Sequence, residues 1–128
     1  MGNRAVITID GTVGVYIHWN GGPESVTAFL DACLARGYRD PWTDPEYAMA
    51  RLTGLLCEFF GQQSDSCVGV GAVKKLSPDL CDNGLYEVGQ GWKITKWTGG
   101  DIEPFTDDQQ KKYGQIIDRL VDKVECLT

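Results

Sequence analysis

The stretch Ala5-Val-Ile-Thr-Ile-Asp-Gly-Thr-Val-Gly-Val-Tyr-Ile-His-Trp19 decides the class of fold. Residues 5–9 are rich in β-branched side chains, which favour a β-strand. Asp10-Gly11 follows, and this dipeptide is typical of a tight hairpin turn. Residues 14–19 then alternate between two faces, as the side chains of a strand do. We therefore predict a β-hairpin over residues 4–19.

Three later segments have the apolar spacing of an amphipathic helix. The first, residues 23–36, begins with a proline, which is favoured at the first helical position, and stops before a glycine. The second, residues 45–60, also begins with a proline and is apolar around much of its circumference. The third begins at Thr106, which forms a capping-box pattern with Gln109, and its apolar stripe runs to the C-terminus.

The remaining regular segments are strands. Residues 67–73 read Cys-Val-Gly-Val-Gly-Ala-Val, and two glycines on one face of this strand would let a helix approach closely. Residues 85–88 and 92–97 predict a second hairpin. The order ββααβββα contains short strand connections and no alternating βαβ units. The sequence therefore predicts one α+β domain over residues 1–128, an antiparallel sheet of about five strands with three helices on one face.

Composition narrows the classes of function. Lys and Arg number 12 against 18 Asp and Glu, giving a net charge of −6, which argues against direct binding of nucleic acid or an anionic membrane. No apolar run reaches the ~20 residues of a membrane span. Five cysteines without a C-x-x-C pair, and a single histidine, predict neither a metal site nor a cofactor. We expect reduced thiols and a cytoplasmic protein, and a homodimer is left open.

An acidic segment near the C-terminus is the first candidate site. No Lys or Arg interrupts residues 99–110, and spaced carboxylates can imitate the phosphates of a nucleic acid. Tryptophans in polar loops are typical interface anchors, although they also cover small cores. A solvated loop followed by a helix cap explains the same acids. The predicted partner surface comprises Trp42, Trp97, Asp101, Glu103, Asp107 and Asp108.

The turn before the first helix is the second candidate site. Amides at a helix N-terminus attract anions, and glycine lets a phosphate approach the backbone. The pattern lacks the P-loop lysine and the dinucleotide-binding fingerprint, and a turn that simply needs glycine explains it as well. No catalytic motif is present, and the lone histidine is the only candidate general base. The predicted ligand site comprises His18, Asn20, Gly21 and Gly22.

The segment Gly14-Val-Tyr-Ile-His-Trp-Asn-Gly-Gly22, followed by Val26-Thr-Ala-Phe-Leu30, resembles small proteins carried by bacteriophages and integrative elements of gut-type bacteria. The resemblance continues through residues 50–52, 59–61 and 82–86, and covers roughly residues 13–97. It carries no known catalytic residues. It implies a mobile-element setting, in which compact acidic proteins often inhibit host defence, as anti-CRISPR proteins do.

Three functions remain as hypotheses. The first is a non-enzymatic inhibitor, in the cytoplasm of a bacterial host, that binds a bacterial defence protein or nuclease complex through the acidic segment. The second is a protein that sequesters a nucleotide-like signal at the Gly21-Gly22 turn. The third is a small enzyme that uses His18 with a nearby cysteine or aspartate.

Overall fold

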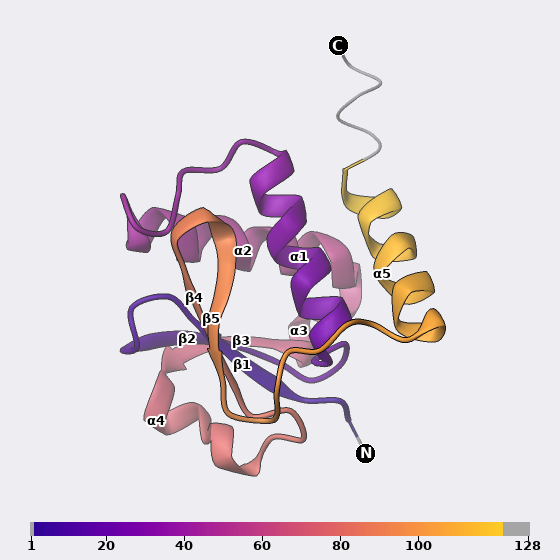
Figure 1. The fold of residues 1–128 in the computed structure, drawn as a ribbon. Coiled ribbons are helices and arrows are strands. Elements are labelled where there is room, and N and C mark those ends of the chain that lie inside the picture. The colour runs from indigo at the N-terminus through magenta and orange to yellow at the C-terminus, as the bar shows by residue number, and fades with distance from the viewer. Residues whose placement is uncertain (1, 122–128) are drawn as a thin grey trace.

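A computed structural model describes residues 2–121. Its centre is one five-stranded sheet with the strand order β3-β2-β1-β4-β5 (Figure 1). The strands are β1 (Ala5–Thr8), β2 (Val13–Ile17), β3 (Val68–Ala72), β4 (Leu85–Gly89) and β5 (Lys93–Trp97). The fold class is therefore α+β, as predicted.

Both predicted hairpins are confirmed. β1 pairs antiparallel with β2, and β4 pairs antiparallel with β5. The first turn is held locally, because the Asp10 carboxylate accepts hydrogen bonds from the backbone N–H groups of Thr12 and Val13. Gly11 has a φ of +82°, a conformation that glycine adopts without steric cost.

The prediction of a purely antiparallel sheet is wrong. β1 lies in the middle of the sheet and pairs parallel with β4, with Val6 opposite Leu85 and Thr8 opposite Glu87. The sheet is therefore mixed. A parallel pair needs a long connection between its strands, and here that connection contains β2, β3 and the helices between them.

The three predicted helices form. α1 (Pro23–Ala35) and α2 (Pro45–Phe60) both begin at the predicted proline, and the Asp44 side chain caps α2 by accepting from the Tyr47 N–H. α5 (Asp107–Leu120) begins with the complete Thr106–Gln109 capping box. The predicted continuation of its apolar stripe to the C-terminus lies outside the described residues.

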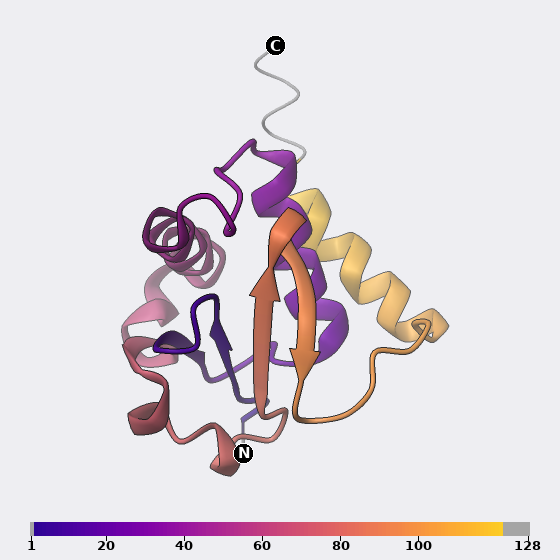
Figure 2. The ribbon, with the colours of Figure 1, turned by 60° about the vertical axis from the view of Figure 1, so that its left-hand side comes forward.

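The prediction of three helices on one face of the sheet is incomplete. Two one-turn helices, α3 (Ser64–Cys67) and α4 (Val73–Leu76), flank β3, and short 3-10 turns occupy 61–63, 78–80 and 90–92. α4 covers the face of the sheet opposite α1 and α2 (Figures 1 and 2). A Cβ atom on Gly71 would lie at an ordinary contact distance of 3.6 Å from Leu76 of α4, and one on Gly69 would meet nothing within 4 Å. The predicted close approach of a helix to these two glycines is therefore wrong.

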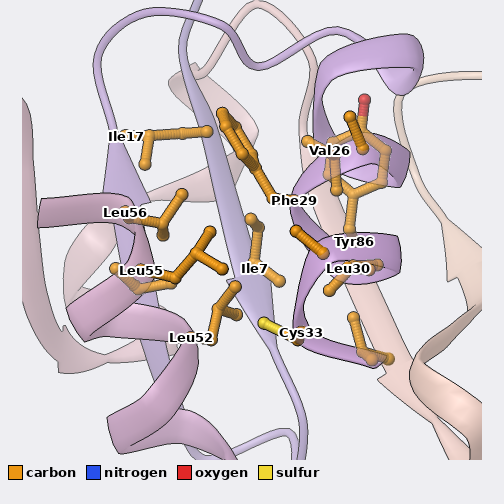
Figure 3. Close-up of a cluster of buried hydrophobic side chains, with 14 of the residues drawn as sticks. Ile7, Ile17, Val26, Phe29, Leu30, Cys33, Leu52, Leu55, Leu56 and Tyr86 are labelled. Carbon is orange, nitrogen blue, oxygen red and sulfur yellow. The ribbon is translucent and has the colours of Figure 1, made fainter. Parts of the chain in front are cut away.

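The core lies between the sheet and helices α1 and α2 (Figure 3). Phe29 of α1 is fully buried, and its ring meets the rings of Phe59 and Phe60 at centroid distances of 5.0 and 6.4 Å. α5 packs on α1, so that α1 lies between α2 and α5 (Figure 2). Among the described residues, no helix is both long and apolar enough to span a membrane.

Candidate functional site

The acidic loop, which we define as residues 99–108, connects β5 to α5. Its four carboxylates, those of Asp101, Glu103, Asp107 and Asp108, are all exposed. None of them forms an ion pair with another residue between 2 and 121. Asp107 and Asp108 occupy the first turn of α5, where the helix dipole stabilises negative charge. Asp101 and Glu103 lie before the helix, so they do not stabilise it in this way.

Trp97 lies beside the acidic loop and is held in place there. Its ring stacks on Tyr86 with a centroid distance of 5.1 Å and an interplanar angle of 6°, and its indole N–H donates to the Asn83 carbonyl. Trp97, Asp101, Glu103 and Phe105 line a cavity of about 360 Å³. The structure thus brings one predicted aromatic and two predicted carboxylates to a single hollow.

Trp42 lies away from this hollow. It is in the loop between α1 and α2 and is 77% exposed, the largest value among the exposed large apolar side chains. The neighbouring Asp40 accepts a hydrogen bond from the Gly91 N–H, which places this loop at the turn of the β4–β5 hairpin. Trp97 lies at the other end of that hairpin, because β5, a strand of five residues and roughly 15 Å, runs from the turn to Trp97.

The glycine turn is packed against the N-terminal strand. Gly21 is buried, its N–H donates to the Asn3 carbonyl, and its carbonyl accepts from the Tyr86 hydroxyl at 2.7 Å. Burial raises the pKa of Tyr86, and the Glu24 carboxylate raises it further. Both backbone polar groups of Gly21 therefore have protein partners.

A carboxylate already lies at the N-terminus of α1. Glu24 is 7% exposed, and its two carboxylate oxygens lie 2.9 Å from where a Cβ of Gly22 would be. Lys112 lies 3.7 Å from this carboxylate, and the Gln109 amide donates to it at 3.3 Å. The Glu24 carboxylate therefore lies at the positive end of the helix dipole, where the sequence predicted a bound phosphate.

His18 interacts with aromatic neighbours. Its Nδ1 atom lies 2.8 Å from the Tyr16 hydroxyl, and its ring and that of Trp19 form a T-shaped pair with a centroid distance of 5.1 Å. Its backbone N–H donates to the Cys67 carbonyl, but no cysteine thiol or aspartate carboxylate of the described residues hydrogen-bonds to its imidazole ring. The pKa of Tyr16 is raised, first by burial and then by the nearby Cys81, and the opposing effect of Arg4 is smaller. The structure therefore gives His18 no acid, base or thiol partner of the kind that nucleophilic catalysis uses.

A groove of about 1250 Å³ lies on the described part of the chain, and no sequence motif predicted it. It is lined by the end of α2, by α3, by Trp19 and Asn20, and by one face of α5. Asn20 is the only residue of the predicted ligand site that lines it. Its walls come from four separate segments, so no local motif could reveal it.

The charges in this groove differ from those of the whole protein. Lys112 and Arg119 line it, and none of the carboxylates within residues 2–121 does. Arg119 lies over the Phe59 ring at 4.3 Å and donates to the Phe59 carbonyl. Amide side chains from Gln62, Gln63 and Gln115 supply further hydrogen-bonding groups. The groove thus offers a weakly basic surface on an acidic protein.

The described cysteines are free thiols. Cys33, Cys57, Cys67 and Cys81 form no disulfide, and Cys126 lies outside the described residues. Burial raises the pKa of Cys33 to about 12, so this thiol is protonated and unreactive at neutral pH. In residues 2–121 no group of three His, Cys, Asp or Glu side chains is placed to hold a metal ion.

Comparison with protein-family models, with curated proteins and with solved structures finds no match to this chain.

Proposed function

We propose that this chain is a non-enzymatic binding protein that inhibits a bacterial defence system by docking on a nuclease or effector complex through its acidic loop. One observation carries the proposal: Asp101 and Glu103 are exposed, form no ion pair within residues 2–121, and line a hollow together with Trp97. The resemblance to proteins of phages and integrative elements suggests the setting.

The hollow suits a basic side chain of the partner. A guanidinium group can stack on an indole and bind carboxylates at the same time. A volume of about 360 Å³ is large enough to take one such side chain. Surfaces that bind nucleic acid are rich in arginine and lysine, so an acidic protein of this kind would compete with nucleic acid for them.

The charge-reversal variant Asp101→Lys/Glu103→Lys tests this proposal. We expect it to abolish protection of a phage that infects a host with an active defence system, measured as plating efficiency on cells that express the protein. With a purified effector complex, the variant should bind at least about tenfold more weakly, because reversed charges repel the basic partner surface.

The matched control is Asp79→Lys/Asp118→Lys, which makes the same change in net charge at exposed sites outside the acidic loop. It should behave as the wild type at equal ionic strength. If both variants protect the phage equally well, or if the wild type leaves plating unchanged on hosts with CRISPR and other nuclease defences, the proposal fails.

A second candidate function is the binding of a small anionic ligand with an aromatic ring, such as a nucleotide. The groove favours it, because Trp19 is 44% exposed there and Arg119 supplies a cation. A base can stack on the indole, and a phosphate can pair with the guanidinium.

Thermal unfolding with mononucleotides and cyclic nucleotides tests the second function. A ligand at 100 times its dissociation constant should stabilise the protein by about 2.7 kcal/mol. The Trp19→Ala and Arg119→Gln variants should lose this shift, and Trp42→Ala should keep it. An unchanged melting temperature with every nucleotide, or a shift that both groove variants retain, would exclude the groove as the site.

A further inference from the structure

The two edges of the sheet differ in how they are protected. β5 forms one edge; it carries Lys93 and Lys96, and its pairing with β4 has an irregular register. Edge lysines and bulges are the usual means by which proteins prevent strand addition. β3 forms the other edge and reads Val-Gly-Val-Gly-Ala, without a charge or a proline. Its central residue, Val70, is 56% exposed.

The backbone groups that β3 presents to solvent follow from its pairing with β2. The His18 N–H donates to the Cys67 carbonyl, and the Val73 N–H donates to the Thr12 carbonyl. Because bonded pairs alternate in an antiparallel ladder, the glycines of β3 also bond to β2. Residues 68, 70 and 72 therefore direct their N–H and C=O groups to the free edge.

Two of these six groups are already used by the flanking helices. The Val68 N–H donates to the Ser64 carbonyl at the end of α3. Ala72 is the N-cap of α4, and the carbonyl of an N-cap residue accepts the first bond of its helix. The free groups are thus the Val68 carbonyl, both groups of Val70 and the Ala72 N–H.

We propose that the β3 edge pairs with the β3 edge of a second copy of this chain, antiparallel and about a two-fold axis at Val70. In this register Val70 lies opposite Val70, and Ala72 lies opposite Val68. The two Val70 residues exchange two hydrogen bonds, and each Ala72 N–H donates to the Val68 carbonyl of the other copy. All four free groups of each copy are satisfied, and two exposed valines are buried against each other.

Charges beyond the strand favour the same arrangement. Asp65 precedes β3, and Lys74 and Lys75 follow it; all three are exposed and form no ion pair within residues 2–121. Antiparallel pairing at Val70 brings the Asp65 of each copy toward the lysines of the other. Parallel pairing would bring the two aspartates together, and like charges at this distance repel. The edge is therefore self-complementary in charge in the antiparallel orientation alone.

Sedimentation of the full chain over a range of concentrations tests this dimer. We expect the mass to rise from 14.1 kDa toward twice that value. Val70→Lys places two like charges opposite each other and should raise the dissociation constant by about tenfold or more. Val70→Pro removes an outward N–H without loss of a bond to β2 and should also yield monomers. Thr95→Lys, the same kind of change on the β5 edge, should leave the dimer intact.

A charge exchange tests the register. Asp65→Lys alone should weaken the dimer, and the triple variant Asp65→Lys/Lys74→Glu/Lys75→Glu should restore it. Circular dichroism checks that each variant is folded. A wild type that stays at 14.1 kDa at every concentration overturns the proposal, and so does a dimer that both Val70 variants leave unchanged. Neither result bears on the acidic loop, since that segment lies beside β5 at the far edge of the sheet.

Discussion

Replacement of Phe29 by alanine is expected to lower the free energy of unfolding by about 4 kcal/mol. Phe29 is fully buried in the core (Figure 3), and its contacts with Phe59 and Phe60 join α1 to the end of α2. Truncation removes a large apolar side chain from water-free surroundings and leaves a cavity that two helices and a sheet cannot easily close. Urea denaturation, followed by circular dichroism, measures the loss as a lower midpoint at an unchanged slope.

Phe29→Leu is the matched control, because it keeps most of the apolar volume. It should cost about 1 kcal/mol. A loss below about 1 kcal/mol for the alanine variant would contradict the placement of Phe29 at the centre of the core.

Gly21→Ala is expected to lower the free energy of unfolding by about 3 kcal/mol, a large effect for one added methyl group. The new Cβ would lie 2.5 Å from the Asn3 carbonyl oxygen and 2.9 Å from the Ala5 Cβ. Asn3 lies just before β1 and Ala5 begins it, and neither atom is the end of a flexible side chain. Relief of the clash must move that strand or the turn, and either movement disturbs the hydrogen bond from Tyr86.

Gly54→Ala is the control for this change. Gly54 lies inside α2, where an added Cβ meets nothing within 4 Å, so alanine should stabilise the helix by about 0.5–1 kcal/mol. Opposite signs for the two variants are expected in the same urea experiment. Equal effects would show that the turn does not need glycine for packing, and would revive its interpretation as a phosphate site.

The sequence predicts those parts of the fold that depend on neighbouring residues. Asp10-Gly11 and the alternation after it specify a hairpin locally, and proline at the first helical position marks the start of α1 and α2. The Thr106–Gln109 box is likewise local and is confirmed in detail. Each of these signals acts within one turn of the chain, so distant residues do not alter it.

Long-range pairing was not predictable in this way. The unbroken apolar run Ala5-Val-Ile7 fits a strand that is buried on both faces, but it does not identify β4 as the second neighbour of β1. α3 and α4 are single turns, too short to show a periodic pattern. The sequence therefore predicted the five strands and the three long helices, but neither α3 and α4 nor the position of β1 in the middle of the sheet.

Some features of the candidate sites could likewise be predicted from the sequence, and others could not. Asp101 and Glu103 were recognisable as an acidic segment, because composition alone reveals them. The partial burial of Trp97 could not be recognised from the sequence, because it depends on Tyr86, which lies opposite Trp97 in the second hairpin. The basic groove combines α5 with residues from the first half of the chain, and no spacing rule connects those segments.

The central position of β1 has a consequence for synthesis on the ribosome. The N-terminal hairpin emerges first, but Leu85, which pairs with Val6, emerges only after the glycine-rich strand and both long helices. Until β4 is synthesised, β1 pairs with β2 alone, and its other edge has no partner. Closing such a long loop is slow, so the β1 edge that later pairs with β4 stays unpaired while residues 9–84 are synthesised.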